Sequence, residues 1–151
     1  MPLPQVPAPP GYATGLDVPT RWADDDVYGH VNNVQHYAFM DTVVNTWLVR
    51  EGGLDTRAGE VIGLCVESSC RYHAALAFPE TVRCGLRVGD LRTRAVRYEV
   101  GLFSEGAVDR EDPRPAAEAT FVHVFVDRTS RRPVAIPQPI RSALERLVLP
   151  G

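Results

Sequence analysis

One short segment of the sequence gathers side chains that could do chemistry on a carbonyl group. Residues 21–33 read RWADDDVYGHVNN and hold three carboxylates, a glycine and a histidine just before a helical pattern. The free N–H groups at a helix N-terminus carry partial positive charge and can stabilise a developing oxyanion. Asp26 precedes Asn33 by seven residues and can fold back beside it, where the helix dipole would keep the carboxylate ionised. The segment therefore combines two requirements of a hydrolase.

Two other interpretations of this segment stay open. The acids and asparagines can act only as loop and cap residues, because Asp and Asn are favoured in turns and at helix N-caps. Alternatively, Asp24, Asp26 and His30 could converge on a cation, although no further cluster of histidines or carboxylates lies nearby. Apart from a metal role, Asp24 and Asp25 are expected to be turn residues and solvent-facing acids.

The helix that must position this segment is predicted from Val34 to Arg50. Five apolar residues fall on one stripe of it: Tyr37, Met40, Val44, Trp47 and Leu48. More apolar residues on its other sides indicate a buried helix, and Gly52-Gly53 supplies a C-terminal stop. Roughly 18 residues make a rod about 27 Å long, which other elements must wrap.

Alternation of apolar and polar residues predicts strands in the rest of the chain. The expected strands cover residues 16–23, 61–72, 81–88, 96–102 and 119–126, and a short amphipathic helix covers 140–148. A strand, a long helix and four further strands joined by short or moderate turns predict an α+β fold with an antiparallel sheet. Residues 1–14, with five prolines in the first ten, are expected to be a flexible tail before a single domain at 15–151.

Composition narrows the class of protein. The 151 residues are 44% hydrophobic and 23% charged, which is typical of one globular domain, and the net charge of −3 argues against nucleic-acid binding. No apolar run is long enough for a membrane span, and no signal peptide is evident. The three cysteines match no CxxC spacing and are expected to be reduced thiols, so a cytoplasmic location is predicted.

The run from Asp26 to Asn33 (DVYGHVNN), followed by Tyr37 and Asp41, resembles the signature of the hotdog-fold acyl-CoA thioesterases. Within them it is similar to the 4-hydroxybenzoyl-CoA thioesterase-like branch, and residues 67–73 and 97–100 also resemble strands of that branch. The resemblance covers about residues 15–130. It implies a five-stranded antiparallel sheet wrapped around a long central helix, with no metal or organic cofactor. It also implies a homodimer whose sheets join edge to edge, often paired into a tetramer.

The resemblance also implies roles for particular residues. Asp26 would be the catalytic carboxylate, acting as a nucleophile through a mixed anhydride or as a general base for water. The backbone N–H of Asn33 or an immediate neighbour would be the oxyanion donor. His30 would orient Asp26 or the substrate carbonyl, or serve only in packing. The residues expected to bind substrate are Tyr28, Gly29 and Tyr37, together with Arg128, Arg131 and Arg132 for the phosphates of CoA.

The activity expected from the resemblance is hydrolysis of an acyl-CoA thioester to a free acid and CoA, with acyl carrier protein as a possible alternative carrier. Two other functions stay open. The first is a hotdog hydratase or dehydratase acting on enoyl thioesters, although one branch of these carries Gly-His-Phe-Pro where this chain has Gly-His-Val-Asn. The second is a non-catalytic acyl-thioester binding protein. A GxSxG elbow, a Walker loop and a GxGxxG motif are missing from the sequence, which excludes the enzyme classes built on them.

Overall fold

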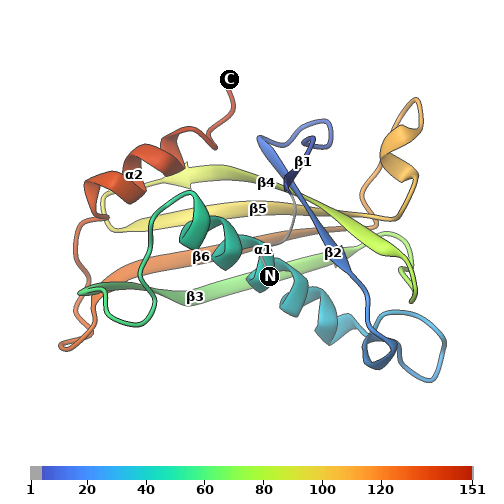
Figure 1. The fold of residues 1–151 in the computed structure, drawn as a ribbon, viewed down its shortest axis with the longest axis horizontal. Helices are drawn as coiled ribbons and strands as arrows, with labels where there is room; N and C mark the ends of the chain where they lie inside the picture. Colours follow the sequence, from blue (N-terminus) through green and yellow to red (C-terminus); the bar gives the residue numbers. More distant parts are fainter. Residues whose placement is uncertain (1–4, 151) are drawn as a thin grey trace.

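The computed structural model describes residues 5–150, which form an α+β fold with one antiparallel sheet (Figure 1). The sheet order is β1-β2-β4-β5-β6-β3, with the bounds β1 Gln5–Val6, β2 Thr14–Pro19, β3 Val61–Tyr72, β4 Thr81–Leu91, β5 Ala95–Phe103 and β6 Ala117–Asp127. The helices are α1 (Asn33–Arg50) and α2 (Gln138–Glu145), with short 3₁₀ turns η1 (Trp22–Asp24) and η2 (Ala107–Asp109). Five longer strands correspond to the five expected ones, and β1 is a short addition. The first of them was expected at residues 16–23 but ends at Pro19, and residues 22–24 form η1 instead.

The helix α1 lies across one face of the sheet (Figure 1). Its buried residues are His36, Phe39, Met40, Val43, Val44, Trp47 and Leu48. On its outer side, Val34 is 70% exposed and Val49 is 48% exposed. The expectation of a long central helix wrapped by the sheet therefore holds only in part, because the sheet covers one side of the helix and leaves the other open.

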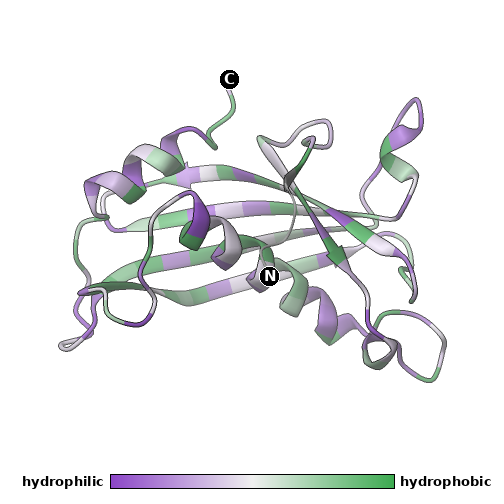
Figure 2. Ribbon diagram, in the orientation of Figure 1, coloured by the Kyte–Doolittle hydropathy of each residue, from purple (hydrophilic) through white to green (hydrophobic). Residues whose placement is uncertain are grey.

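Alternation along the strands builds the core between the sheet and α1. Figure 2 shows hydrophobic and hydrophilic residues alternating along the strands. The buried side chains of β4 and β5 that face the core are Val82, Cys84, Leu86, Val88, Val96, Tyr98, Val100 and Leu102. Within residues 5–150, no helix combines the length and apolar character that crossing a membrane requires.

The strand β3 forms a long free edge of the sheet, since it pairs only with β6. The opposite edge, β1, has two residues. A bulge in β3 between Cys65 and Glu67 shifts the register, and beyond it Ser69 bonds to Thr120 on the sheet face away from α1. Tyr72 points to the other face and reaches α1. A long unpaired strand edge is a ready site for pairing with another chain.

Part of the segment expected to be a flexible tail packs on the sheet, while residues 1–4 lie outside the described part of the chain. Gln5–Val6 pairs with β2, and the ring of Tyr12 lies over two glycines, Gly85 and Gly101, which face each other across β4 and β5. A Cβ on Gly85 would come within 2.5 Å of the Tyr12 ring. Because the two glycines have no side chains, the Tyr12 ring can pack directly on the sheet at this point. The Arg87 guanidinium lies 4.8 Å above the centroid of the ring.

Ala13, just before β2, and Leu147, just after α2, both bond to the middle of β4. The backbone N–H of Ala13 donates to the carbonyl of Leu86 at 3.0 Å. Two residues further along the strand, the N–H of Val88 donates to the carbonyl of Leu147, also at 3.0 Å.

Candidate functional site

The acidic segment before α1 is a narrow hairpin, not an open loop. Asp25 and Val31 face each other as an antiparallel bridge. Next to this bridge, the N–H of Asn32 donates to the carbonyl of Asp24 at 2.9 Å. The hairpin is also attached to the loop before β4, because the N–H of Val31 donates to the carbonyl of Leu76 at 2.7 Å. These bonds close residues 24–32 into a hairpin that leads directly into the helix.

Asp26 sits at the first position of the turn at the tip of this hairpin. Its N–H donates to the His30 carbonyl at 2.9 Å, and its own carbonyl accepts from the N–H of Gly29 at 3.1 Å. Its Oδ1 accepts from the N–H of Tyr28 at 2.9 Å, which fixes the direction of the carboxylate. Within residues 5–150, no hydrogen bond is found at Oδ2 of Asp26, so this oxygen is free to meet a substrate or water. Gly29 has a φ of 83°, a conformation that favours glycine.

The helix N-terminus next to this turn is capped by Asn32. Its side-chain oxygen accepts from the N–H of Val34 at 3.0 Å, and α1 begins at Asn33. In the part of the chain that the structure describes, the N–H of Asn33 meets no hydrogen-bond acceptor. A free N–H in the first turn of an 18-residue helix is a suitable donor to an oxyanion.

Asp24 differs from the expectation of a solvent-facing acid. It is 1% exposed, and Oδ1 forms an ion pair with Nη2 of Arg21 at 2.8 Å while Oδ2 accepts from the Arg21 N–H at 2.7 Å. Asp25 is half-buried and accepts from the N–H of Phe78 at 3.1 Å. Both acids thus hold the hairpin in place. With Asp24 engaged by Arg21, the three ligands of a cation site do not assemble, and residues 5–150 contain no cluster of three or more metal-ligating side chains.

The other residues expected around the site are exposed near the helix N-terminus. His30 and Tyr28 lie on the surface of the hairpin, and Tyr28 is 83% exposed. Tyr37 is 38% exposed, one turn along α1 from Asn33. Trp22 is 82% exposed and packs edge-on against Phe78, with ring centroids 5.8 Å apart. The candidate carboxylate therefore lies beside an exposed apolar surface.

The three expected CoA-binding arginines lie at the other end of α1. Arg128 donates to the carbonyls of Gly59 and Thr56, at 2.6 and 2.7 Å, and so fixes the loop that follows the helix. Arg131 and Arg132 are exposed in the turn after β6, and Arg131 has a φ of 63°. Within one chain the structure does not bring these side chains to Asp26, because a helix of this length spans about 27 Å.

Two residues at the helix start were not singled out from the sequence. His36 is 3% exposed, and its Nδ1 lies 3.2 Å from the carbonyl oxygen of Asn32. Burial lowers the pKa of His36. Tyr72, at the end of β3, donates its hydroxyl to the Asn33 carbonyl at 3.0 Å. Its ring meets that of His36 edge-on at 4.8 Å. Only the fold reveals this contact, because 39 residues separate the two partners of the hydrogen bond.

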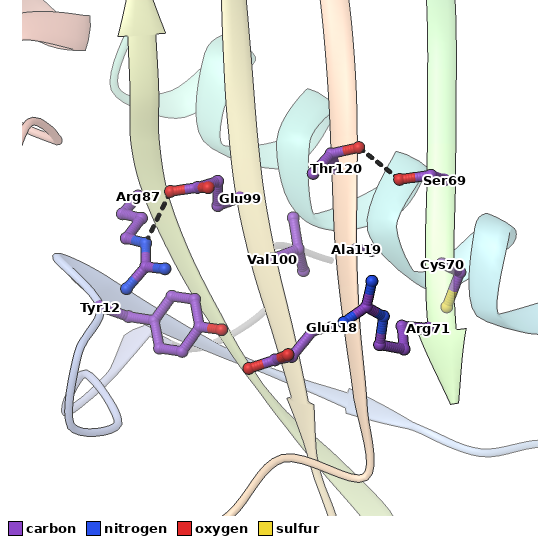
Figure 3. A pocket seen from close by; sticks show the side chains of 10 residues that line it. All are labelled: Tyr12, Ser69, Cys70, Arg71, Arg87, Glu99, Val100, Glu118, Ala119 and Thr120. Carbon is purple, nitrogen blue, oxygen red and sulfur yellow. Dashed lines mark hydrogen bonds and ion pairs between the residues drawn. The ribbon is translucent and has the colours of Figure 1, made fainter. Parts of the chain in front are cut away.

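A separate hollow of about 330 Å³ lies on the sheet face away from α1 (Figure 3). Its lining includes Tyr12, Arg71, Arg87, Glu99 and Glu118. The charges of these two arginines and two glutamates cancel, and Arg87 is hydrogen-bonded to Glu99 at 2.9 Å. Asp26 and Asn33 are not among the lining residues, so this hollow is not part of the candidate site.

Comparison with known proteins was made for sequence and for structure. A profile of the thioesterase-like superfamily matches residues 20–144. Among curated proteins, no match was found. The PA5185 protein of Pseudomonas aeruginosa is 52% identical, with 96% of this chain and 97% of that chain covered and a TM-score of 0.87. The PA2801 protein of the same organism, a candidate thioesterase, is 27% identical over 88% of this chain and 98% of its own, with a TM-score of 0.77.

A more distant structure shares the fold. Slr0204, a 1,4-dihydroxy-2-naphthoyl-CoA thioesterase from Synechocystis, is 18% identical, with 90% of this chain and 98% of its own covered and a TM-score of 0.75. The superfamily profile spans most of the chain, including the acidic hairpin, α1 and the four strands β3, β4, β5 and β6. The chain therefore belongs to the thioesterase-like superfamily, and its sheet and helix are those of a hotdog thioesterase.

Proposed function

We propose that this protein hydrolyses acyl-CoA thioesters to a free acid and CoA, with Asp26 as the reacting carboxylate. The observation that carries the proposal is the hairpin that fixes the direction of the Asp26 carboxylate and leads directly into the first turn of α1, in a chain of the thioesterase-like superfamily. Among the described residues, the hairpin thus offers a carboxylate oxygen without a protein partner, and the helix start that follows it offers an N–H without an acceptor. CoA as the carrier is in keeping with Slr0204, which is named for a CoA thioester.

The proposed chemistry has two forms. In the first, the Asp26 carboxylate attacks the thioester carbonyl, CoA leaves as the thiolate, and water cleaves the mixed anhydride. In the second, Asp26 takes a proton from water, and the resulting hydroxide attacks the carbonyl directly. In both forms negative charge develops on the carbonyl oxygen, where the N–H of Asn33 would stabilise it by about 2.7–4 kcal/mol. His30, on the same hairpin, would orient the carboxylate or the substrate carbonyl.

We further propose a homodimer that completes the substrate site. Two copies related by a twofold axis and joined through their β3 edges must run antiparallel. The Val61 end of the partner's β3 then lies toward the Tyr72 end of the first. Since Val61 pairs with Asp127 in the sheet, the partner's turn at 128–132 approaches the first protomer's helix N-terminus. This arrangement would allow Arg131 and Arg132 to meet CoA phosphates from across the interface.

Release of free thiol from short, long and aromatic acyl-CoAs by the wild-type protein and by Asp26→Asn tests the proposed function. The wild type should release CoA from at least one thioester, and Asp26→Asn should lower the rate by at least about a hundredfold. Asp25→Asn is a matched control, because it changes the neighbouring carboxylate, which accepts from the Phe78 N–H, a bond that the Asn oxygen can keep. Its rate should stay within a few-fold of wild type. Hydration of crotonyl-CoA without thiol release would instead identify a hydratase, and tight binding without turnover would identify a binding protein.

A further inference from the structure

Tyr72 is the one side chain from the sheet whose hydroxyl is hydrogen-bonded to the first turn of α1, among the residues that the structure describes. The acceptor is the carbonyl of Asn33, the residue whose N–H is the proposed oxyanion donor. This carbonyl belongs to the peptide group that follows Asn33, so the bond holds the residue from its C-terminal side. The cap formed by Asn32 and the hairpin hold it from the N-terminal side.

His36 supports the tyrosine from within the helix. A carbonyl oxygen can only accept a hydrogen bond, so the 3.2 Å contact between His36 Nδ1 and the Asn32 carbonyl requires the proton on Nδ1. That bond fixes the plane of the imidazole ring. The ring in turn meets the Tyr72 ring edge-on, with centroids 4.8 Å apart and an interplanar angle of 85°. The histidine is 3% exposed, so packing holds it in this orientation.

The Tyr72 hydroxyl stays protonated and can therefore always donate its hydrogen bond. Burial, with smaller contributions from Cys70 and Tyr37, raises the pKa of Tyr72 to about 12. The hydroxyl therefore keeps its proton throughout the range in which a carboxylate-based hydrolase works. The Asn33 carbonyl receives the hydrogen bond at every such pH.

We propose that Tyr72, steadied by His36, is a positioning residue that aims the Asn33 N–H at the thioester oxygen. This inference rests on the proposed function. It adds a requirement that the local sequence of the hairpin does not contain, namely that the end of β3 must be docked on the helix for the oxyanion donor to be aligned. A shift of a donor by a fraction of an ångström weakens a bond that matters most in the transition state.

The variant Tyr72→Phe keeps the ring and its contact with His36 but removes the hydroxyl. We expect kcat to fall about tenfold, while KM and the affinity for a thioether analogue of the best acyl-CoA stay unchanged. Ser69→Ala is the matched control on the same strand. It removes a 2.6 Å hydroxyl contact with Thr120 on the opposite face, and its kcat should equal that of wild type.

The outcomes separate this inference from the proposed function. If wild type turns over, Asp26→Asn is inactive and Tyr72→Phe retains the wild-type kcat, Tyr72 is not a positioning residue. An equal loss in Ser69→Ala, or a rise in KM and weaker analogue binding with unchanged kcat, would also overturn the inference. If the wild-type protein releases no thiol from any thioester, the proposed function fails, and the inference fails with it.

Discussion

The backbone N–H of Asp26 and the carbonyl oxygen of His30 lie 2.9 Å apart, so the turn that carries the candidate carboxylate is closed by its own main chain. This closure depends on Gly29, whose positive φ lets the chain reverse direction between the two residues. The direction of the carboxylate is thus set by backbone conformation, and a change that strains the backbone should reach the chemistry without touching the carboxylate itself.

The substitution Gly29→Ala tests this dependence. A Cβ at this position meets no atom within 4 Å, so the cost is that of a positive φ, about 1–2 kcal/mol of unfolding free energy. We expect a lower thermal midpoint and a kcat reduced about tenfold or more, since a small misplacement of a reacting group is costly. Gly53→Ala is the control, because Gly53 has a φ of 71° and equally open surroundings beyond the far end of α1. Loss of activity in both variants would show that stability alone, not the turn, controls the rate.

Removing the positive charges from the exposed turn after β6 should weaken binding of the CoA part of the substrate. Binding of the acyl group should not change. For Arg131→Gln combined with Arg132→Gln, we expect KM for an acyl-CoA to rise about fivefold to tenfold, with less dependence on salt. KM for the same acyl group on N-acetylcysteamine, which has no phosphates, should not change. Arg114→Gln serves as the comparison, because Arg114 is an exposed arginine ion-paired to Asp112. An equal rise in KM for both substrates would show that Arg131 and Arg132 do not bind the CoA phosphates.

Acidification should destabilise the protein through His123 before its carboxylates are protonated. His123 is 2% exposed in an aromatic cluster, and burial lowers its pKa to about 4. Between that value and about 6.5 the unfolded chain binds more protons than the folded one, so stability falls as the pH is lowered through this window. The loss for this residue is up to about 3 kcal/mol. Urea unfolding of the wild type at pH 7, 6, 5 and 4 should show this loss of unfolding free energy. In His123→Leu the unfolding free energy should depend less on pH. The same pH dependence in both proteins would show that His123 is not the group responsible.

Replacing a glycine beneath the Tyr12 ring by a larger residue should displace the segment before β2 from the sheet. Gly85→Ala places a methyl group within 2.5 Å of the Tyr12 ring, so the ring and the Arg87 guanidinium above it must move. We expect a loss of about 1–3 kcal/mol of unfolding free energy. In a Tyr12→Ala background the same substitution should cost much less, because the clash is already gone. Additive effects in this double-mutant cycle would mean that Tyr12 is not the group displaced.

Periodicity alone located most of the fold. The predicted helix 34–50 differs from α1 by one residue, and the strand predicted at 61–72 coincides with β3. The packing of Tyr12 was not predictable, because it depends on two glycines that lie side by side only once β4 and β5 are in register. The proline-rich composition around Tyr12 indicated a flexible tail, because composition carries no information about the packing of one ring on two distant glycines.

The candidate site was predictable only where its residues are neighbours in sequence. The hairpin and the helix start follow one another in the sequence, so spacing alone predicts that Asp26 and Asn33 act together. Three consecutive aspartates look alike in sequence, and only the structure shows that Asp24 is buried and ion-paired with Arg21, while Oδ2 of Asp26 has no partner among the described residues. Tyr72 comes from a different element, and its hydrogen bond to the helix start depends on the docking of β3 beside α1.

The attachment of Ala13 and Leu147 to β4 has a practical consequence for engineering and for turnover. Because Ala13 and Leu147 bond within two residues of each other on that strand, digestion by exopeptidases from either side would remove support from the same place. Fusion partners and affinity tags need linkers that leave these two bonds intact. The nearness of the two attachments also makes the chain a good subject for circular permutation, with new ends opened in the exposed loop at 105–114.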